Sequence, residues 1–111
     1  MKDFEVKTAA EDGRAVVTLA GECDLDGRDR LAAALLDAVD DAAMVYVDLA
    51  ALRFLDSSGL HALVTAYQTA QQRGGQLYLV NATGAVATLL DVTGVGELLR
   101  PPADGAGPVR S

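Results

Sequence analysis

The sequence predicts a single α/β domain, in which helices pack against a β-sheet. Half of the 111 residues are hydrophobic, which is enough for one domain with a core of its own. Segments typical of strands alternate with segments typical of helices in the order β-β-α-β-α-β-α, with a possible short strand at the end. Strand-helix-strand units favour parallel neighbouring strands joined by right-handed crossovers. We therefore expect one domain over residues 1–100, and a disordered tail rich in proline and glycine over residues 101–111.

The first two strands are expected to form a hairpin. FEVKTA at residues 4–9 and RAVVTLA at residues 14–20 have strand-like composition, and the EDG between them is typical of a turn. Because the later strands are expected to run parallel, this hairpin makes the predicted sheet mixed. RDRLAAALLDAVDD at residues 28–41 then repeats apolar residues every four positions in an alanine-rich context, which predicts an amphipathic helix.

The middle of the chain predicts a buried strand followed by a second helix. AMVYVDL at residues 43–49 is a nearly continuous apolar run, typical of a central strand that is covered on both faces. From Gly59 onward apolar residues recur at helical spacing, and RGG at residues 73–75 ends this helix. QLYLV at residues 76–80 predicts a further strand.

Two short elements are expected near the C-terminus. GAVATLLDVTG at residues 84–94 predicts a short helix that places Val86, Leu89 and Leu90 on one side. GELLR at residues 96–100 predicts a last strand at an edge of the sheet.

The junction FLDSSGL stands where the buried strand gives way to the second helix, and such junctions often carry the functional sites of α/β folds. The first turn of a helix has unpaired backbone N–H groups and the positive end of the helix dipole, so a hydroxyl there caps the helix and an anion is stabilised. Ser57 or Ser58 is the expected N-cap, and a plain serine cap is one interpretation of the motif. Gly59 is a poor helix former, which indicates that another group approaches closely there.

Charge and composition exclude several classes of protein. The formal net charge is −7, which argues against nucleic-acid binding, and thirteen of the sixteen acidic residues precede residue 57. This acidity suits either a solvated surface or a basic protein partner. No apolar run is long enough to span a bilayer and no signal sequence is apparent, so we expect a cytoplasmic protein without membrane association. The lone Cys23 is expected to be a half-buried thiol.

The motifs of common enzyme classes are missing from the sequence. GVGELL contains only G-x-G, and no G-x-x-x-x-G-K-[ST] loop follows a strand. LDSSGL does not match G-x-S-x-G, and the one histidine, His61, has no evident nucleophile to activate. We expect no catalytic residues, no metal site and no bound cofactor.

Four segments together resemble the STAS domains of the anti-sigma factor antagonist family. VDLAALRFLDSSGLHAL resembles the apolar strand and the D-S-[ST]-G-L motif of the family, and GECDLDG resembles its G-E-[LI]-D loop. RGGQLYLV and LLDVTGV resemble the later G-G-x-L and F-x-x-[ST]-G-L segments. The order and spacing of these segments extend the resemblance over about residues 4 to 100, and the resemblance implies a single STAS-type domain with a mixed sheet.

The resemblance implies a partner switch in which this chain is a substrate and not an enzyme. An unphosphorylated antagonist binds an anti-sigma factor of the histidine-kinase-like ATPase type and releases the sigma factor. The partner then phosphorylates the serine after the motif's aspartate, which is Ser57 here, with Ser58 as second choice. ATP and magnesium belong to the partner, and a separate serine phosphatase reverses the modification. The chain is expected to be a monomer when no partner is bound.

The switch requires the modified serine to lie inside or beside the partner interface. The expected partner-binding residues come from the GECD loop and the start of the second helix: Glu22, Asp24, Asp56, Ser58, Gly59, Leu60 and His61. Two residues depart from the family pattern, because Cys23 replaces an apolar residue and His61 stands where the family often has glycine. An alternative function is a phosphorylation-independent STAS subunit of a transporter or stress-signalling complex.

Overall fold

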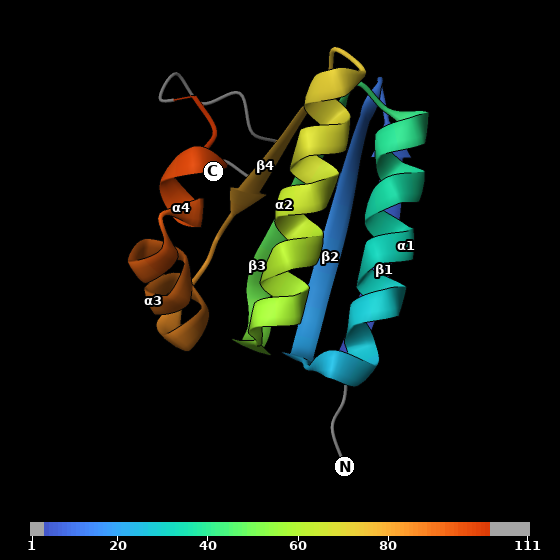
Figure 1. Ribbon diagram of the computed structural model, residues 1–111. Coiled ribbons are helices and arrows are strands. Elements are labelled where there is room, and N and C mark those ends of the chain that lie inside the picture. The colour runs from blue at the N-terminus through green and yellow to red at the C-terminus, as the bar shows by residue number, and fades with distance from the viewer. Residues whose placement is uncertain (1–3, 103–111) are drawn as a thin grey trace.

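The computed structural model describes residues 4–102 as four strands and four helices (Figure 1). The expected order of the first seven elements is confirmed. In chain order the elements are β1 (Phe4–Glu11), β2 (Arg14–Cys23), α1 (Leu25–Asp41), β3 (Met44–Leu55), α2 (Ser57–Gln72), β4 (Gln76–Val80), α3 (Gly84–Thr93) and α4 (Val95–Leu98). Among the described residues, no helix is both long enough and apolar enough to cross a membrane.

The sheet is mixed, as expected, and its strand order is β1-β2-β3-β4. β1 and β2 form the predicted antiparallel hairpin, whereas β2, β3 and β4 run parallel. Asp12 and Gly13 make the hairpin turn, and both have positive φ angles, of 52° and 78°. A two-residue turn of this kind matches the right-handed twist of the strands, and Asp-Gly is one of the pairs that adopt it most readily.

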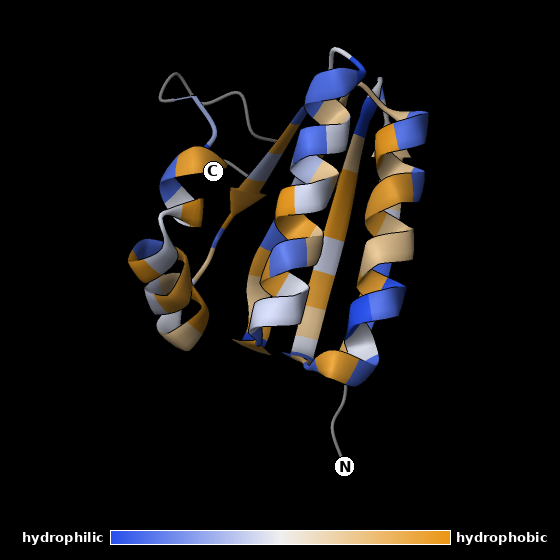
Figure 2. Ribbon diagram, in the orientation of Figure 1, coloured by the Kyte–Doolittle hydropathy of each residue, from blue (hydrophilic) through white to orange (hydrophobic). Residues whose placement is uncertain are grey.

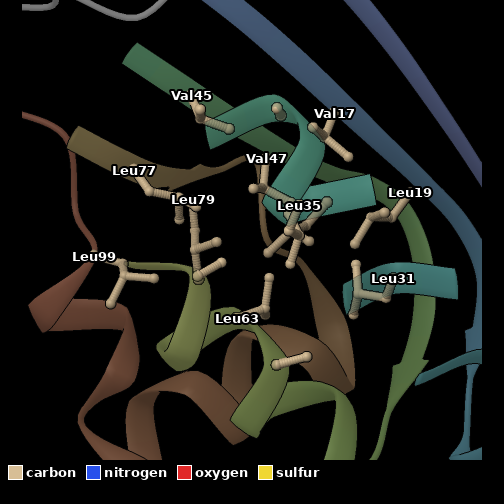
Figure 3. Packing of buried hydrophobic residues seen from close by; sticks show 14 of the residues in the cluster. Val17, Leu19, Leu31, Leu35, Val45, Val47, Leu63, Leu77, Leu79 and Leu99 are labelled. Atoms are coloured by element: carbon tan, nitrogen blue, oxygen red, sulfur yellow. The ribbon is translucent and has the colours of Figure 1, made fainter. Parts of the chain in front are cut away.

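α1 and α2 lie side by side on one face of the sheet (Figure 1). Alternate residues of β2 are buried beneath them, and the strand segments behind the two helices are largely hydrophobic (Figure 2). Strand and helix side chains meet there in one core (Figure 3). The fully buried core residues labelled in that view include Val17, Leu19, Leu31, Leu35, Val45, Val47, Leu63, Leu77 and Leu99.

β3 is one of the two inner strands and is longer than the predicted 43–49. Its pairing with β2 shifts twice, because Thr18 and Ala20 pair with Asp48 and Ala51, and Gly21 and Glu22 pair with Leu52 and Phe54. Each shift adds one residue to β3, as in a β-bulge. The two insertions let leucines three positions apart all face the core: Leu49, Leu52 and Leu55.

Both long helices begin earlier than the sequence indicates. α1 starts at Leu25 instead of residue 28, and α2 starts at Ser57 instead of Gly59. In each case an aspartate caps the helix directly after the preceding strand, so little loop remains between strand and helix. The predicted end of α2 and the predicted strand at 76–80 are confirmed.

The expected edge strand at 96–100 is wrong, because this segment begins with the short helix α4. The backbone N–H groups of Leu98 and Leu99 donate to Gly94 and Val95, which are helical hydrogen bonds. The segment nevertheless reaches the sheet, since the Leu99 carbonyl accepts a hydrogen bond from the N–H of Leu79 in β4 at 2.9 Å. Most of the tail expected to be disordered, residues 103–111, lies outside the described part of the chain.

Candidate functional site

The carboxyl ends of β2 and β3 meet at one edge of the sheet, and each leads directly into a helix. Cys23, the last residue of β2, pairs with Leu55, the last residue of β3. The Asp56 N–H donates to the Cys23 carbonyl at 3.1 Å, which ties the two strand ends together. The N-termini of α1 and α2 therefore lie next to each other at this edge (Figure 1). The GECD and DSSGL segments, which are far apart in the sequence, are neighbours in space.

The N-cap of α2 is Asp56, so the prediction that Ser57 or Ser58 caps the helix is wrong. Asp56 has extended backbone angles, and its Oδ1 atom accepts a hydrogen bond from the N–H of Gly59 at 3.0 Å. The same oxygen accepts a hydrogen bond from the Ser58 hydroxyl at 2.7 Å. A carboxylate caps a helix as well as a hydroxyl does and adds a negative charge at the positive end of the helix dipole.

The two serines of the motif occupy different environments. Ser58 is half-buried, and its hydroxyl is used to support the capping carboxylate. Ser57 is the first residue of α2, and its side chain is exposed to solvent. Because Ser57 is more exposed and the Ser58 hydroxyl is engaged with Asp56, an incoming reagent or protein reaches Ser57 more readily than Ser58.

The electrostatics of this edge are set by Asp56 and its neighbours. The hydrogen bonds from the Ser58 hydroxyl and from the Gly59 backbone lower the pKa of Asp56 below its usual value of 3.8, so the carboxylate is charged at neutral pH. Asp24 caps α1 in the same way, since its Oδ1 accepts from the N–H of Asp26 at 3.1 Å. Two aspartates therefore lie at the starts of two adjacent helices.

Cys23 is fully buried beneath these caps, not half-buried as predicted. Burial, followed by the charges of Asp56 and Asp24, raises the pKa of the Cys23 thiol to about 11. The thiol is therefore protonated at neutral pH, and a protonated, buried thiol is a poor nucleophile. This environment gives Cys23 the character of a core residue.

Gly59 is closely packed inside the domain. A Cβ atom at this position would lie 2.6 Å from Cδ1 of Leu55 and 3.1 Å from Sγ of Cys23. The close approach that the sequence indicated therefore comes from the ends of β3 and β2 and does not need a bound ligand. The absence of a side chain lets α2 start directly above the sheet.

The other residues expected to bind a partner lie around this edge. Leu60 is half-buried and His61 is exposed on the first turns of α2. Glu22 precedes Cys23 in β2, so its side chain points to the opposite face of the sheet, where it lies 3.9 Å from Arg53. The structure thus brings Asp24, Asp56 and Ser57 to one edge and separates Glu22 from them. In residues 4–102 no three His, Cys, Asp or Glu side chains are placed to hold a metal ion.

Comparison with known families identifies the domain. The family model described as "Mlab, STAS domain" matches residues 6–101. The chain belongs to the STAS domain family. This confirms the resemblance that the four sequence segments indicated, and the strand order and helix positions described above are those of this STAS domain.

Relatives of this STAS domain include named regulators. The anti-sigma-B factor antagonist of Bacillus subtilis (strain 168) is 28% identical over 94 residues, which cover 85% of this chain and 86% of the relative. The crystal structure of an anti-sigma factor antagonist from Mycobacterium paratuberculosis matches with a TM-score of 0.79 and 27% identity, covering 92% of this chain and 89% of that one. The anti-sigma factor antagonist SpoIIAA in its unphosphorylated form shares the fold, with a TM-score of 0.74, 19% identity and coverage of 92% and 90%.

One feature of the STAS domain was missed from the sequence, namely a groove between α1 and α2 beside the two helix starts. The groove has a volume of about 310 Å³. Its lining residues are Arg28, Asp29, Ala32 and Leu36 of α1 and His61, Ala62, Thr65 and Ala66 of α2. The lining residues of each helix recur four positions apart, so the sequence could have indicated that they share one face of that helix. Which face of α1 opposes which face of α2 is decided by the packing of the two helices.

Proposed function

We propose that this STAS domain is an anti-sigma factor antagonist that is switched off by phosphorylation of Ser57. In the unphosphorylated state it binds an anti-sigma factor, which then releases its sigma factor. The observation that carries this proposal is the exposed hydroxyl of Ser57, placed at the first position of α2 directly after the capping carboxylate of Asp56. Two named antagonists, at 28% and 27% identity over most of the chain, support the same function.

A phosphate on Ser57 is compatible with the fold. It adds about 1.5 to 2 negative charges at pH 7, and the start of a helix stabilises an anion through its N–H groups and dipole. Since Ser57 lies on the surface, the phosphate displaces no core side chain. The domain is therefore expected to stay folded in both states.

The partner interface is where the phosphate acts. The new charge appears beside Asp56, at an edge that Asp24 already makes acidic, so it adds to the negative charge of this surface. A partner that packs against the neutral hydroxyl then meets a larger, charged group. Burying such a charge in the interface without a cation from the partner to pair with it costs several kcal/mol, which corresponds to a hundredfold or greater loss of affinity.

The chemistry of phosphoryl transfer is assigned to the partner. We infer that an anti-sigma factor of the histidine-kinase-like ATPase type supplies ATP and magnesium, and that a serine phosphatase reverses the modification. The partner surface on this chain comprises Asp24, Asp56, Ser58, Gly59, Leu60 and His61, with Glu22 at its margin. In this scheme the STAS domain itself has no catalytic role.

The experiment uses a histidine-kinase-like anti-sigma factor from the same genome, ATP and magnesium. Intact-mass analysis is expected to show one added phosphate on the wild type and none on Ser57→Ala, which still binds the partner. Ser57→Asp is expected to bind weakly, because it carries one charge near the interface.

Ser58→Ala is the matched control, because it removes the neighbouring hydroxyl of the same motif. It is expected to accept phosphate at Ser57, with a loss of about 0.5–1.5 kcal/mol in unfolding free energy from its hydrogen bond to Asp56. Phosphate mapped to Ser58 in the wild type would reverse the assignment of the two serines. Partner binding without any phosphate transfer would favour the phosphorylation-independent subunit.

A further inference from the structure

Arg28 and His61, one from each helix, carry N–H groups into the lining of the groove between α1 and α2. Arg28 comes from the first turn of α1 and His61 from the second turn of α2, and both line the groove. Nε of Arg28 donates to Oδ1 of Asp29 at 3.0 Å. This contact leaves the guanidinium with N–H groups on its two terminal nitrogens that suit a phosphate.

His61 is placed one helical turn after Ser57. Residues four apart in a helix lie on the same face with their Cβ atoms about 5–6 Å apart. Side chains in a helix also lean toward the N-terminus, so His61 covers the turn that begins with Ser57. Ser57 and His61 are both exposed, so a group attached to Ser57 lies within one helical turn of the groove that His61 lines.

We propose that His61 and Arg28 act as positioning residues that hold the phosphate of phosphorylated Ser57 against the mouth of the α1–α2 groove. This inference rests on the proposed function, because it concerns the phosphorylated state of Ser57. Arg28 of α1 and His61 of α2 both take part, and in the phosphorylated state their side chains contact the phosphate instead of the partner.

Arg28 and His61 lie in a mostly acidic surrounding, in which the effect of either one on a phosphate is measurable. Near the starts of α1 and α2 the other charged side chains are Asp24, Asp26, Asp29, Arg30, which lies over the Phe4 ring, and Asp56, together with the pair formed by Glu22 and Arg53. The carboxylates disfavour the second negative charge of a phosphate, whereas a cation or an N–H donor favours it. Removal of His61 or Arg28 therefore makes the second ionisation of the phosphate occur at higher pH.

The test places phosphoserine at position 57 during translation and follows the phosphate by ³¹P NMR as a function of pH. The second ionisation of phosphoserine lies near pH 6. The titration midpoint is expected to rise by about 0.5 to 1 pH unit in His61→Gln and in Arg28→Gln, and the difference is expected to shrink at high salt because the site is exposed. His61→Lys places an ammonium group at this position and is expected to keep the midpoint low.

Arg73→Gln is the matched control, because Arg73 follows the far end of α2, where it pairs with Asp40 at 2.9 Å. It removes one positive charge about 24 Å along the helix from Ser57, beyond the screening distance, and is expected to leave the midpoint unchanged. The same midpoint in wild type, His61→Gln and Arg28→Gln would overturn the proposal. An equal rise in the control would also overturn it, since the effect would then be one of net charge.

The test needs no partner kinase, so its failure is distinct from failure of the proposed function. If phosphate transfer to Ser57 occurs but the ³¹P midpoints do not differ, only the role of His61 and Arg28 is wrong. If the partner modifies no serine but the midpoints differ as expected, Arg28 and His61 bind phosphate at this position and the proposed switch is wrong.

Discussion

Asp56 links three structural roles at the start of α2. It follows the last residue of β3, caps the helix through Gly59, and accepts the hydroxyl hydrogen bond of Ser58. Both hydrogen bonds end on one oxygen of the ionised Asp56 carboxylate. The start of α2, and with it the position of Ser57, therefore depends on that oxygen. A change at Asp56 is therefore expected to alter stability as well as the presentation of Ser57.

Asp56→Ala is expected to lower the free energy of unfolding by about 0.5–2 kcal/mol at pH 7, and Asp56→Asn by less, since an amide oxygen can still cap. The pKa of Asp56 is lowered from 3.8 in the folded state. Its charge therefore stabilises the fold above about pH 3.8, and this contribution is lost as the pH falls through the lower folded-state pKa. Urea unfolding at a series of pH values checks this, and a difference between wild type and Asp56→Asn that stays constant down to the lowest pH would contradict it.

At the scale of elements, β3 determines the position of the site. The two bulges keep Leu49, Leu52 and Leu55 in the core while the strand extends to the residue before Asp56. A regular strand would turn every second residue outward, so leucines three positions apart could not all be buried. The bulges therefore connect β3 to the start of α2 without exposing these leucine side chains.

Leu52→Ala is expected to destabilise the domain by about 2–5 kcal/mol, because Leu52 is 2% exposed and its loss leaves a cavity. Leu98→Ala is the matched control: the same atoms are removed from a leucine that is 52% exposed, and the expected change is within about 0.5 kcal/mol. Urea unfolding monitored by circular dichroism measures both. Equal losses would mean that the second half of β3 does not face the core.

The elements whose apolar residues recur with one regular period were predicted well. The features that depend on contacts between elements were not. QLYLV at 76–80 alternates cleanly, and its strand was predicted with the correct bounds. The second half of β3 was missed because bulges interrupt its period of two. The start of α2 was misplaced because Asp56 and not a serine caps it, and the start of α1 because the capping role of Asp24 was not recognised. The groove was missed because the pairing of α1 with α2 is a tertiary feature.

At the scale of the whole molecule, the core and the candidate site are continuous. Cys23 belongs to the core cluster, lies beside Gly59, and accepts a backbone hydrogen bond from the N–H of Asp56. The residues that present Ser57 are therefore attached to the most buried part of the sheet. This arrangement favours a rigid site, and in the proposed switch the charge of the phosphate, not a refolding of the domain, changes partner binding.

The single cysteine provides a test of this rigidity. Cys23 is fully buried, and burial raises the pKa of its thiol to about 11, so both access and the thiolate fraction are low in the folded state. Labelling with a thiol reagent at neutral pH is therefore expected to proceed only through unfolding, and its rate then reports the equilibrium between folded and unfolded molecules. The free energy obtained from labelling is expected to equal that from urea unfolding. Leu52→Ala should lower both values by the same amount, whereas labelling much faster than global unfolding would show that the edge around Cys23 and Asp56 opens locally.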